Sequence, residues 1–197
     1  LVSGEGGMQN AVDAAQALVA EHGYWMPNQF ENPANPEAHR QTTGPEILAQ
    51  VPGPIDAFVA SVGTGGTITG TGEVLKARYP ALQVYAIEPA ESPVLSGGAP
   101  GPHKIPGAGA GFIPGVLNRQ IIDQIVTVTS DEAWRMTRRL AREEGLAVGI
   151  SSGANVCAAL RVARRMGEGH TVVVILPDGA ERYLSTGVFA GGSSPGE

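Results

Sequence analysis

The sequence predicts an α/β fold in which a mostly parallel, twisted β-sheet lies between two layers of helices. Short apolar or β-branched runs at residues 57–62, 83–88, 124–128 and 171–176 alternate with longer segments of helical periodicity. Parallel neighbouring strands must be joined by crossovers, and the alternating helices supply them. The 28 glycines and 15 prolines among 197 residues indicate that many positions lie in loops and turns.

Composition excludes several other classes of protein. Hydrophobic residues make up 42% of the chain and charged residues 16%, which is typical of a globular protein rather than a disordered one. A formal net charge of −6 argues against sequence-independent binding of nucleic acid, which needs a basic face. The longest aliphatic run, residues 172–176, is far shorter than the roughly 20 residues that cross a bilayer. We therefore expect neither nucleic acid nor a membrane as a partner.

One cysteine and four histidines limit the metal and redox chemistry of the chain. Cys157 alone can form neither an internal disulfide nor a Cys-x-x-Cys site, and the histidines show no metal-binding spacing. We expect no metal site and a cytoplasmic protein.

The first quarter of the chain predicts two helices separated by an irregular segment. Apolar residues recur at helical spacing over residues 8–21, and Gly23 follows as a helix stop. Residues 24–36 contain aromatic side chains and Asn-Pro steps, which disfavour a helix and suggest the end of a strand running into an ordered loop. A short helix ending near Gln50 then precedes the strand at residues 57–62.

The middle of the chain repeats the order of strand, loop and helix. A helix over residues 67–78 precedes the second strand, and a Gly/Pro-rich stretch over residues 96–114 separates the second strand from the third. Thr129 and Glu132 have the spacing of a capping box, which predicts a helix that begins after Thr129 and reaches Glu144.

The last third ends in the most β-rich run of the sequence. Small residues at 149–153 predict a turn that opens a helix over residues 154–166. The strand at residues 171–176 follows. Residues 191–197 are rich in Gly, Ser and Pro, so we predict a disordered tail.

A glycine-rich turn between the first strand and its helix is a candidate anion site. Free amides and the positive end of a helix dipole meet there, and glycines let a ligand approach the backbone. The turn contains Gly63, Thr64, Gly65, Gly66 and Thr67. Gly65 and Gly70 have the spacing of a Walker motif, but Thr71 follows where that motif has Lys, so the motif is excluded. A dinucleotide-binding motif is excluded because Ile68 stands where its third glycine is required. On this pattern alone, a phosphate site and a turn without a ligand fit equally well.

Three further segments contain residues suited to binding or to ordinary structure. Within residues 149–155, Ser151 and Ser152 could place a hydroxyl against the ring of a ligand, or could simply cap a helix. Residues 27–35 fit a rigid loop that presents Gln29 to a ligand, or a loop that satisfies only its own backbone. Residues 102–114 fit a pocket wall or a plain surface loop.

Taken together, six motifs occur in the order found in cysteine synthases. They are NQFENPANP (28–36), TTGPEI (42–47), GTGGT (63–67), GAGFIP (109–114), GISSGA (149–154) and ERYLST (181–186). From residue 1 to about residue 189, the chain resembles the cysteine synthase (O-acetylserine sulfhydrylase) family of fold-type II pyridoxal-phosphate enzymes.

The resemblance implies a pyridoxal 5′-phosphate site and a substrate pocket. The residues implied to hold the cofactor phosphate are Gly63, Thr64, Gly65, Gly66 and Thr67. Ser151 would bond the pyridine nitrogen, and a neutral hydroxyl there favours β-elimination because it leaves that nitrogen largely unprotonated. Gln29 would bind the substrate carboxylate, while Gly109 and Ala110 would line the pocket.

The implied reaction makes L-cysteine and acetate from O-acetyl-L-serine and sulfide, in a homodimer whose pocket also accepts the carboxyl-terminal tail of serine acetyltransferase. The family's Schiff-base lysine lies upstream of the matched part, and neither Lys76 nor Lys104 matches it. We therefore expect the carboxyl-terminal two-thirds of such an enzyme, with no catalytic residue of its own and inactive alone. Residues 1–33 would end a small domain, and residues 34–190 would form the large one.

Three alternatives remain open from the sequence. One is a cystathionine β-synthase, although Ala110 and Gly111 stand where that enzyme has Tyr-Asp before Phe112. Another is a sulfhydrylase that uses O-phosphoserine. The third is a non-catalytic module that binds the acetyltransferase tail. Pro106, Ala108 and Ala180 depart from the common family residues, which leaves the substrate preference undecided.

Overall fold

A computed structural model describes residues 6–190, and within them four strands form a parallel sheet. The strands are β1 (Ala57–Ser61), β2 (Gln83–Pro89), β3 (Gln124–Val128) and β4 (Val172–Val174), in the order β3-β2-β1-β4. Each neighbouring pair is parallel, so the carboxyl ends of all four strands meet at one edge. The predicted α/β class is confirmed, and the predicted disordered tail lies outside the described residues.

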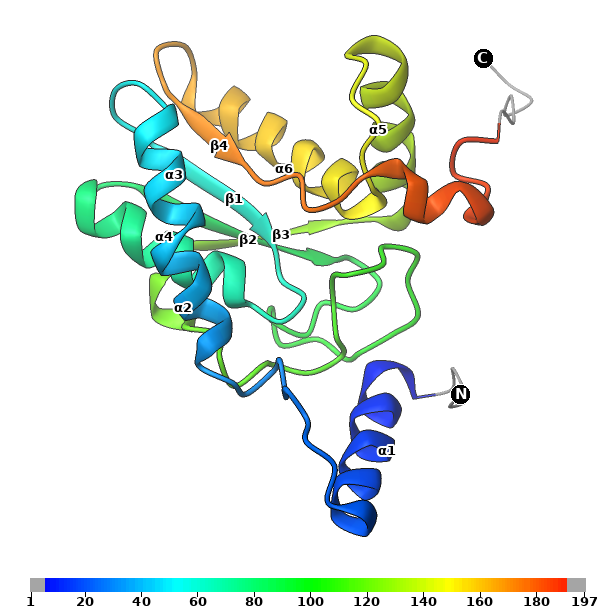
Figure 1. The fold of residues 1–197 in the computed structure, drawn as a ribbon. Coiled ribbons are helices and arrows are strands. Elements are labelled where there is room, and N and C mark those ends of the chain that lie inside the picture. Colours follow the sequence, from blue (N-terminus) through cyan, green and yellow to red (C-terminus); the bar gives the residue numbers. More distant parts are fainter. Residues whose placement is uncertain (1–5, 191–197) are drawn as a thin grey trace.

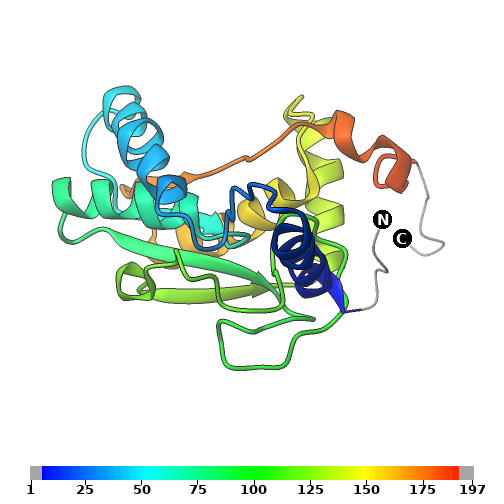
Figure 2. The ribbon, with the colours of Figure 1, turned by 60° about the horizontal axis from the view of Figure 1, so that its bottom comes forward.

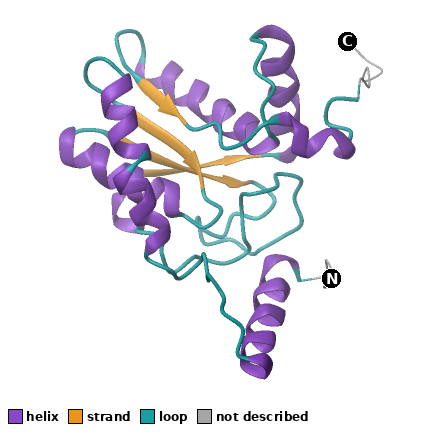
Figure 3. Cartoon of the chain, viewed as in Figure 1, coloured by secondary structure: helices purple, strands orange, loops and turns teal. Residues whose placement is uncertain are grey.

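Helices cover both faces of the sheet, as Figures 1 and 3 show. On one side lie α5 (Ser130–Glu143) and α6 (Ile150–Met166). On the other lie α2 (Ala34–Gln41), α3 (Thr43–Gln50) and α4 (Gly66–Arg78). Two short 3₁₀ helices, η1 (Arg119–Ile121) and η2 (Ala180–Thr186), connect these elements. The arrangement is the predicted three-layer fold.

Side chains that alternate along β1 enter two separate hydrophobic clusters. Ala57 and Val59 pack with α5 and α6, while Phe58 and Ala60 pack with α3 and α4. All four are at most 2% exposed. Because both faces are covered, the strand is a continuous apolar run rather than an alternating one.

Helix α1 (Gly7–His22) lies below the sheet in Figure 1, next to the loops that follow the strands (Figures 1 and 2). None of its residues is buried against the rest of residues 6–190. Gly23 ends the helix in the left-handed conformation, with φ 67°, as the sequence predicts. No helix in the described part of the chain is long and apolar enough to cross a membrane.

Two local predictions were wrong. Residues 24–36 contain no strand, and α2 already begins at Ala34, with Pro36 in its first turn, where a missing N–H is tolerated. The turn predicted at residues 149–153 is instead mostly the first turn of α6. A Cβ on Gly153 would lie 2.2 Å from Thr137 Oγ1, so this small residue serves helix packing against α5.

Candidate active site

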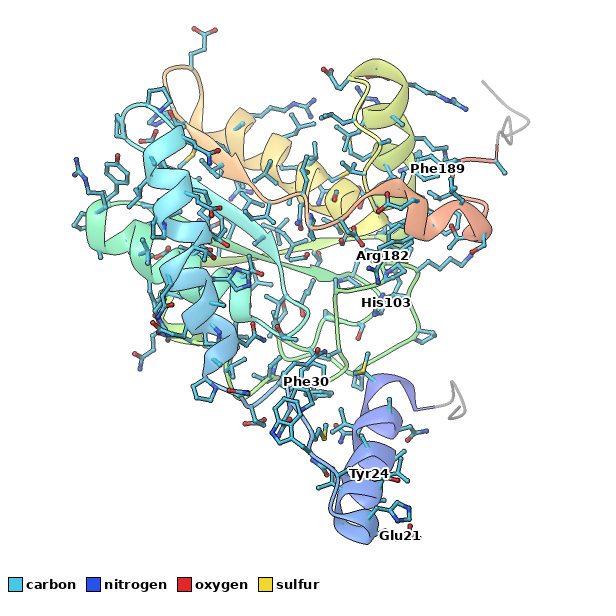
Figure 4. The ribbon with its side chains drawn as sticks, in the orientation of Figure 1. Glu21, Tyr24, Phe30, His103, Arg182 and Phe189 are labelled. Carbon is cyan, nitrogen blue, oxygen red and sulfur yellow. The ribbon has the colours of Figure 1, made fainter. Side chains whose placement is uncertain are left out.

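A cavity of about 1050 Å³ opens where the loops after β1 and β2 meet the start of α1. Five of the nine predicted site residues line it: Gln29, Gly63, Thr64, Gly109 and Ala110. They come from three segments that are far apart in the sequence. Phe30 and His103 also line the cavity; Figure 4 labels Phe30 next to α1 and His103 on the loops of the body above it.

The turn after β1 leads directly into the amino terminus of α4. Gly65 caps the helix with φ +86°, a conformation that side chains rarely adopt. The first amides of a helix have no partner within it, and the helix dipole adds positive potential at that end. This turn can therefore bind an anionic group without a positively charged side chain.

Thr64 is held so that its hydroxyl proton remains available. Its Oγ1 accepts a hydrogen bond from Asn35 Nδ2 at 2.9 Å and one from Gly66 N at 3.3 Å. A hydroxyl has two acceptor lone pairs and one donor, so the O–H of Thr64 is left to donate to a ligand. Thr64 lines the cavity, which gives that proton access to a bound anion.

Close packing explains two glycines of this turn. A Cβ on Gly63 would lie 2.2 Å from Gly107 O, and one on Gly66 would lie 1.8 Å from Asn35 Oδ1. Any side chain at either position would push away a neighbouring segment of the site. The requirement for glycine at these two positions is therefore steric, whereas at Gly65 the positive φ also favours glycine.

Thr67 contacts a histidine on α2. Its Oγ1 lies 3.1 Å from His39 Nε2, and His39 Nδ1 lies 2.9 Å from Thr43 Oγ1. Burial lowers the pKa of His39, which favours a neutral ring carrying one N–H. Unlike Gly63 and Thr64, the next three residues of the turn, Gly65, Gly66 and Thr67, do not line the cavity. The sequence reasoning missed His39 because no motif links it to Thr67.

The loop that contains Gln29 is fastened to the opposite wall. Phe30 and Phe112 stack edge to face with ring centroids 4.9 Å apart, and Val116 N donates to Phe30 O at 3.0 Å. Asn35 Nδ2 also donates to Gln29 O at 2.8 Å. These contacts fix the backbone beside Gln29 and leave its side chain at the cavity.

Ser151 does not line this cavity. It occupies the first turn of α6 and is 4% exposed. The neighbouring Ser152 is fully buried, and its Oγ has no hydrogen-bond partner in residues 6–190. The structure thus brings five predicted residues to one cavity but does not bring Ser151 to it.

Both lysines of the chain are engaged away from the cavity. Lys76 Nζ pairs with Asp123 Oδ2 at 2.7 Å, and Lys104 Nζ lies 6.0 Å from the centre of the Trp134 ring. Neither lysine lines the cavity. No cluster of His, Cys, Asp or Glu suited to a metal ion occurs within the described residues.

The sequence profile of pyridoxal-phosphate dependent enzymes matches residues 1–178. The chain belongs to this family. A curated cysteine synthase from Staphylococcus aureus strain N315 is 56% identical over 191 residues, which are 96% of this chain and 62% of that protein. The predicted resemblance is confirmed, and the chain spans about 62% of the length of such curated relatives.

Solved structures agree with this membership in the pyridoxal-phosphate dependent family. A crystal structure of a mutant O-ureido-L-serine synthase with bound O-ureido-L-serine matches with a TM-score of 0.93 at 43% identity, covering 100% of this chain and 61% of that one. A cysteine synthase from Entamoeba histolytica matches with a TM-score of 0.91 at 39% identity, covering 100% of this chain and 59% of that one. The relatives are therefore similar in both sequence and backbone over the whole described fold.

Proposed function

We propose that this chain supplies the cofactor-phosphate and substrate sites of a pyridoxal-phosphate dependent enzyme that makes L-cysteine and acetate from O-acetyl-L-serine and sulfide. One observation carries the proposal: a single cavity joins Gln29, at one wall, to the donor-rich turn at Thr64. The similarity to cysteine synthases supports the choice of substrates.

The turn from Gly63 to Thr67 fits the cofactor phosphate. Phosphate oxygens only accept hydrogen bonds, and the turn offers the Thr64 hydroxyl proton and the amides that follow Gly66 in the first turn of α4. We propose that Ser151 approaches the pyridine nitrogen. When bound, pyridoxal phosphate withdraws electrons from the α-carbon of an amino acid, which permits loss of a β-substituent.

The remaining residues would bind and orient the amino acid. Gln29 would donate to the substrate carboxylate, and its loop is already fixed by the Phe30 and Asn35 contacts. Gly109 and Ala110 would shape the wall without obstructing a β-substituent, because neither side chain exceeds a methyl group. Since Lys76 and Lys104 are engaged elsewhere, we propose that activity needs a lysine which these 197 residues do not contain.

Partners and location follow from the same proposal. We propose a cytoplasmic homodimer whose cavity also admits the carboxyl-terminal tail of a serine acetyltransferase. The open cavity lined by Gln29 and Phe30 is compatible with a short peptide. Titration with a synthetic acetyltransferase tail, competed with O-acetyl-L-serine, tests whether both ligands use this cavity.

Cofactor binding is tested on the purified chain by equilibrium dialysis with pyridoxal phosphate. We expect Thr64→Val to lower the affinity about tenfold, because it removes one donor to a charged acceptor. Thr71→Val is the matched control, since Thr71 is fully buried in α4 and does not line the cavity. Equal affinity of wild type and Thr64→Val would contradict the phosphate assignment.

The reaction is tested after fusing the full chain to the amino-terminal third of a Staphylococcus aureus cysteine synthase. O-acetyl-L-serine, L-serine and O-phospho-L-serine are each offered with sulfide or with homocysteine. We expect L-cysteine from O-acetyl-L-serine and sulfide to be the fastest product. Faster formation of cystathionine would favour a cystathionine β-synthase, and a preference for O-phospho-L-serine would favour a sulfhydrylase that uses it. Binding of the acetyltransferase tail without any turnover would favour a non-catalytic module.

A further inference from the structure

A serine outside the predicted site lines the cavity and has a buried hydroxyl without a partner in the described residues. Ser92 follows β2 by three residues, is 1% exposed and lines the cavity. Its Oγ has no hydrogen-bond partner among residues 6–190. A buried hydroxyl without a partner is costly, so each such group in a native fold calls for an explanation. A hydroxyl that also borders a binding cavity is explained by a ligand that accepts its proton.

The segment that packs beside Ser92 contributes mostly apolar residues to the cavity wall. A Cβ on Gly101 would lie 2.4 Å from Glu91 O, and one on Gly109 would lie 2.8 Å from Pro89 Cδ. The segment from residue 100 to residue 109 therefore packs directly on the residues just before Ser92. Its apolar members at the cavity are Pro100, Pro102, Pro106 and Ala108. This wall can accept a small apolar group beside a single hydroxyl.

His103, the other polar side chain of this wall, is already occupied. Its Nδ1 accepts a hydrogen bond from Ile105 N at 3.3 Å, so the ring proton lies on Nε2, which donates to Gly109 O at 3.1 Å. Both ring nitrogens of a neutral imidazole are then used within the protein. Ser92 is left as the side-chain donor that this wall offers to a ligand.

We propose that Ser92 is a further substrate-contacting residue, whose hydroxyl donates a hydrogen bond to the carbonyl oxygen of the substrate's O-acyl group. An acetyl ester has one carbonyl acceptor and one methyl group, which match one hydroxyl and an apolar wall. A carboxylate or phosphate would instead need several donors or a positive potential, as the turn at Thr64 provides. The inference rests on the proposed function, because it assigns the acyl end of that substrate.

The test measures binding to the full 197-residue chain by saturation-transfer NMR. O-acetyl-L-serine and L-alanine share the amino and carboxylate groups, and only the former has an acyl group. We expect Ser92→Ala to weaken O-acetyl-L-serine about three- to tenfold and to leave L-alanine unchanged. Thr71→Val is the matched control, because it also removes a fully buried, unpartnered hydroxyl but one that does not line the cavity.

Thermal unfolding without ligand separates recognition from a structural role. Since the Ser92 hydroxyl has no partner within the described protein, Ser92→Ala should not lower the melting temperature. The assignment is overturned if Ser92→Ala has a lower melting temperature than the wild type. It is also overturned if Ser92→Ala weakens both ligands equally or binds O-acetyl-L-serine as the wild type does. Failure of the wild type to bind O-acetyl-L-serine would overturn it as well. If the wild type still binds pyridoxal phosphate in dialysis, only the Ser92 inference falls; if it binds neither ligand, the proposed function falls as well.

Discussion

Asn35 Nδ2 lies 2.9 Å from Thr64 Oγ1 and donates to Gln29 O at 2.8 Å. An amide nitrogen has two protons, so both bonds form at once. A single side chain on α2 thereby ties the proposed phosphate turn to the proposed substrate loop. The two halves of the cavity keep their relative positions through this amide.

Asn35→Ala should therefore weaken two different ligands. Without the amide, the Thr64 hydroxyl and the backbone at Gln29 each lose an orienting bond, so we expect the affinities for pyridoxal phosphate and for L-alanine to fall about three- to tenfold. Equilibrium dialysis and NMR titration measure them. Gln41→Ala on the same helix is the control, because within residues 6–190 the Gln41 amide donates its side-chain hydrogen bond to the exposed Glu37. Unchanged affinities in Asn35→Ala would refute the linking role.

Two glycines of α4 should differ in their tolerance of alanine. A Cβ on Gly66 would lie 1.8 Å from Asn35 Oδ1. A Cβ on Gly72 would approach the flexible end of Ile121, at 2.7 Å from Cδ1, and would make an ordinary contact with Val84 Cγ2 at 3.5 Å. We expect Gly66→Ala to lower the free energy of unfolding by about 1–3 kcal/mol. Gly72→Ala should stay within about 1 kcal/mol of wild type, because a helix interior favours Ala over Gly. Urea unfolding decides, and equal losses in both variants would argue against the Gly66 clash.

Elements with strong local signals were predictable from sequence, and two helix starts were not. The capping box forms as expected: Thr129 Oγ1 accepts from Glu132 N, and Glu132 accepts from Thr129 N at 3.0 Å. The starts of α2 and α6 were missed because their first turns contain prolines or small residues that also suit loops. Only the packing of Gly153 on α5 shows why a glycine is needed inside α6.

In the candidate site, too, the residues in sequence motifs were predictable, whereas the contacts between distant segments were not. Ordered motifs were enough to select the turn at Thr64 and the loop at Gln29, which the fold brings to one cavity. The contacts that orient them, from Asn35 and His39, join residues about thirty positions apart. Ser92 belongs to none of the six motifs. It stands out only because no hydrogen-bonding group of the described protein pairs with its buried hydroxyl. Such long-range pairings exist only in the packed structure.

Asp56 should make stability depend on acid pH. Its Oδ2 accepts from Thr171 N at 2.7 Å, and His170 Nδ1 lies 3.3 Å from Oδ1. The hydrogen bond from Thr171, followed by His170, lowers the pKa of Asp56. A lowered folded pKa stabilises the protein above the unfolded value of about 3.9, and this stabilisation is lost as the pH falls below it.

We therefore expect Asp56→Asn to cost about 1–2 kcal/mol of unfolding free energy at pH 7, since it removes a charged acceptor between the starts of β1 and β4. At pH 2.5 the difference from wild type should shrink. Urea unfolding at both pH values measures it. A difference that is the same at both would show that the ionised carboxylate is not what stabilises this junction.

Tyr183 should ionise unusually late. Its hydroxyl donates to Asp178 Oδ2 at 2.5 Å, and burial together with Asp178 raises its pKa to about 12. The folded state then keeps a proton that the unfolded state loses near pH 10, so stability should fall as the pH rises from about 10 to 12. The difference in ultraviolet absorbance between wild type and Tyr183→Phe isolates this phenol. Asp178→Asn should move its titration toward lower pH, and a wild-type midpoint near 10 would contradict the buried pairing.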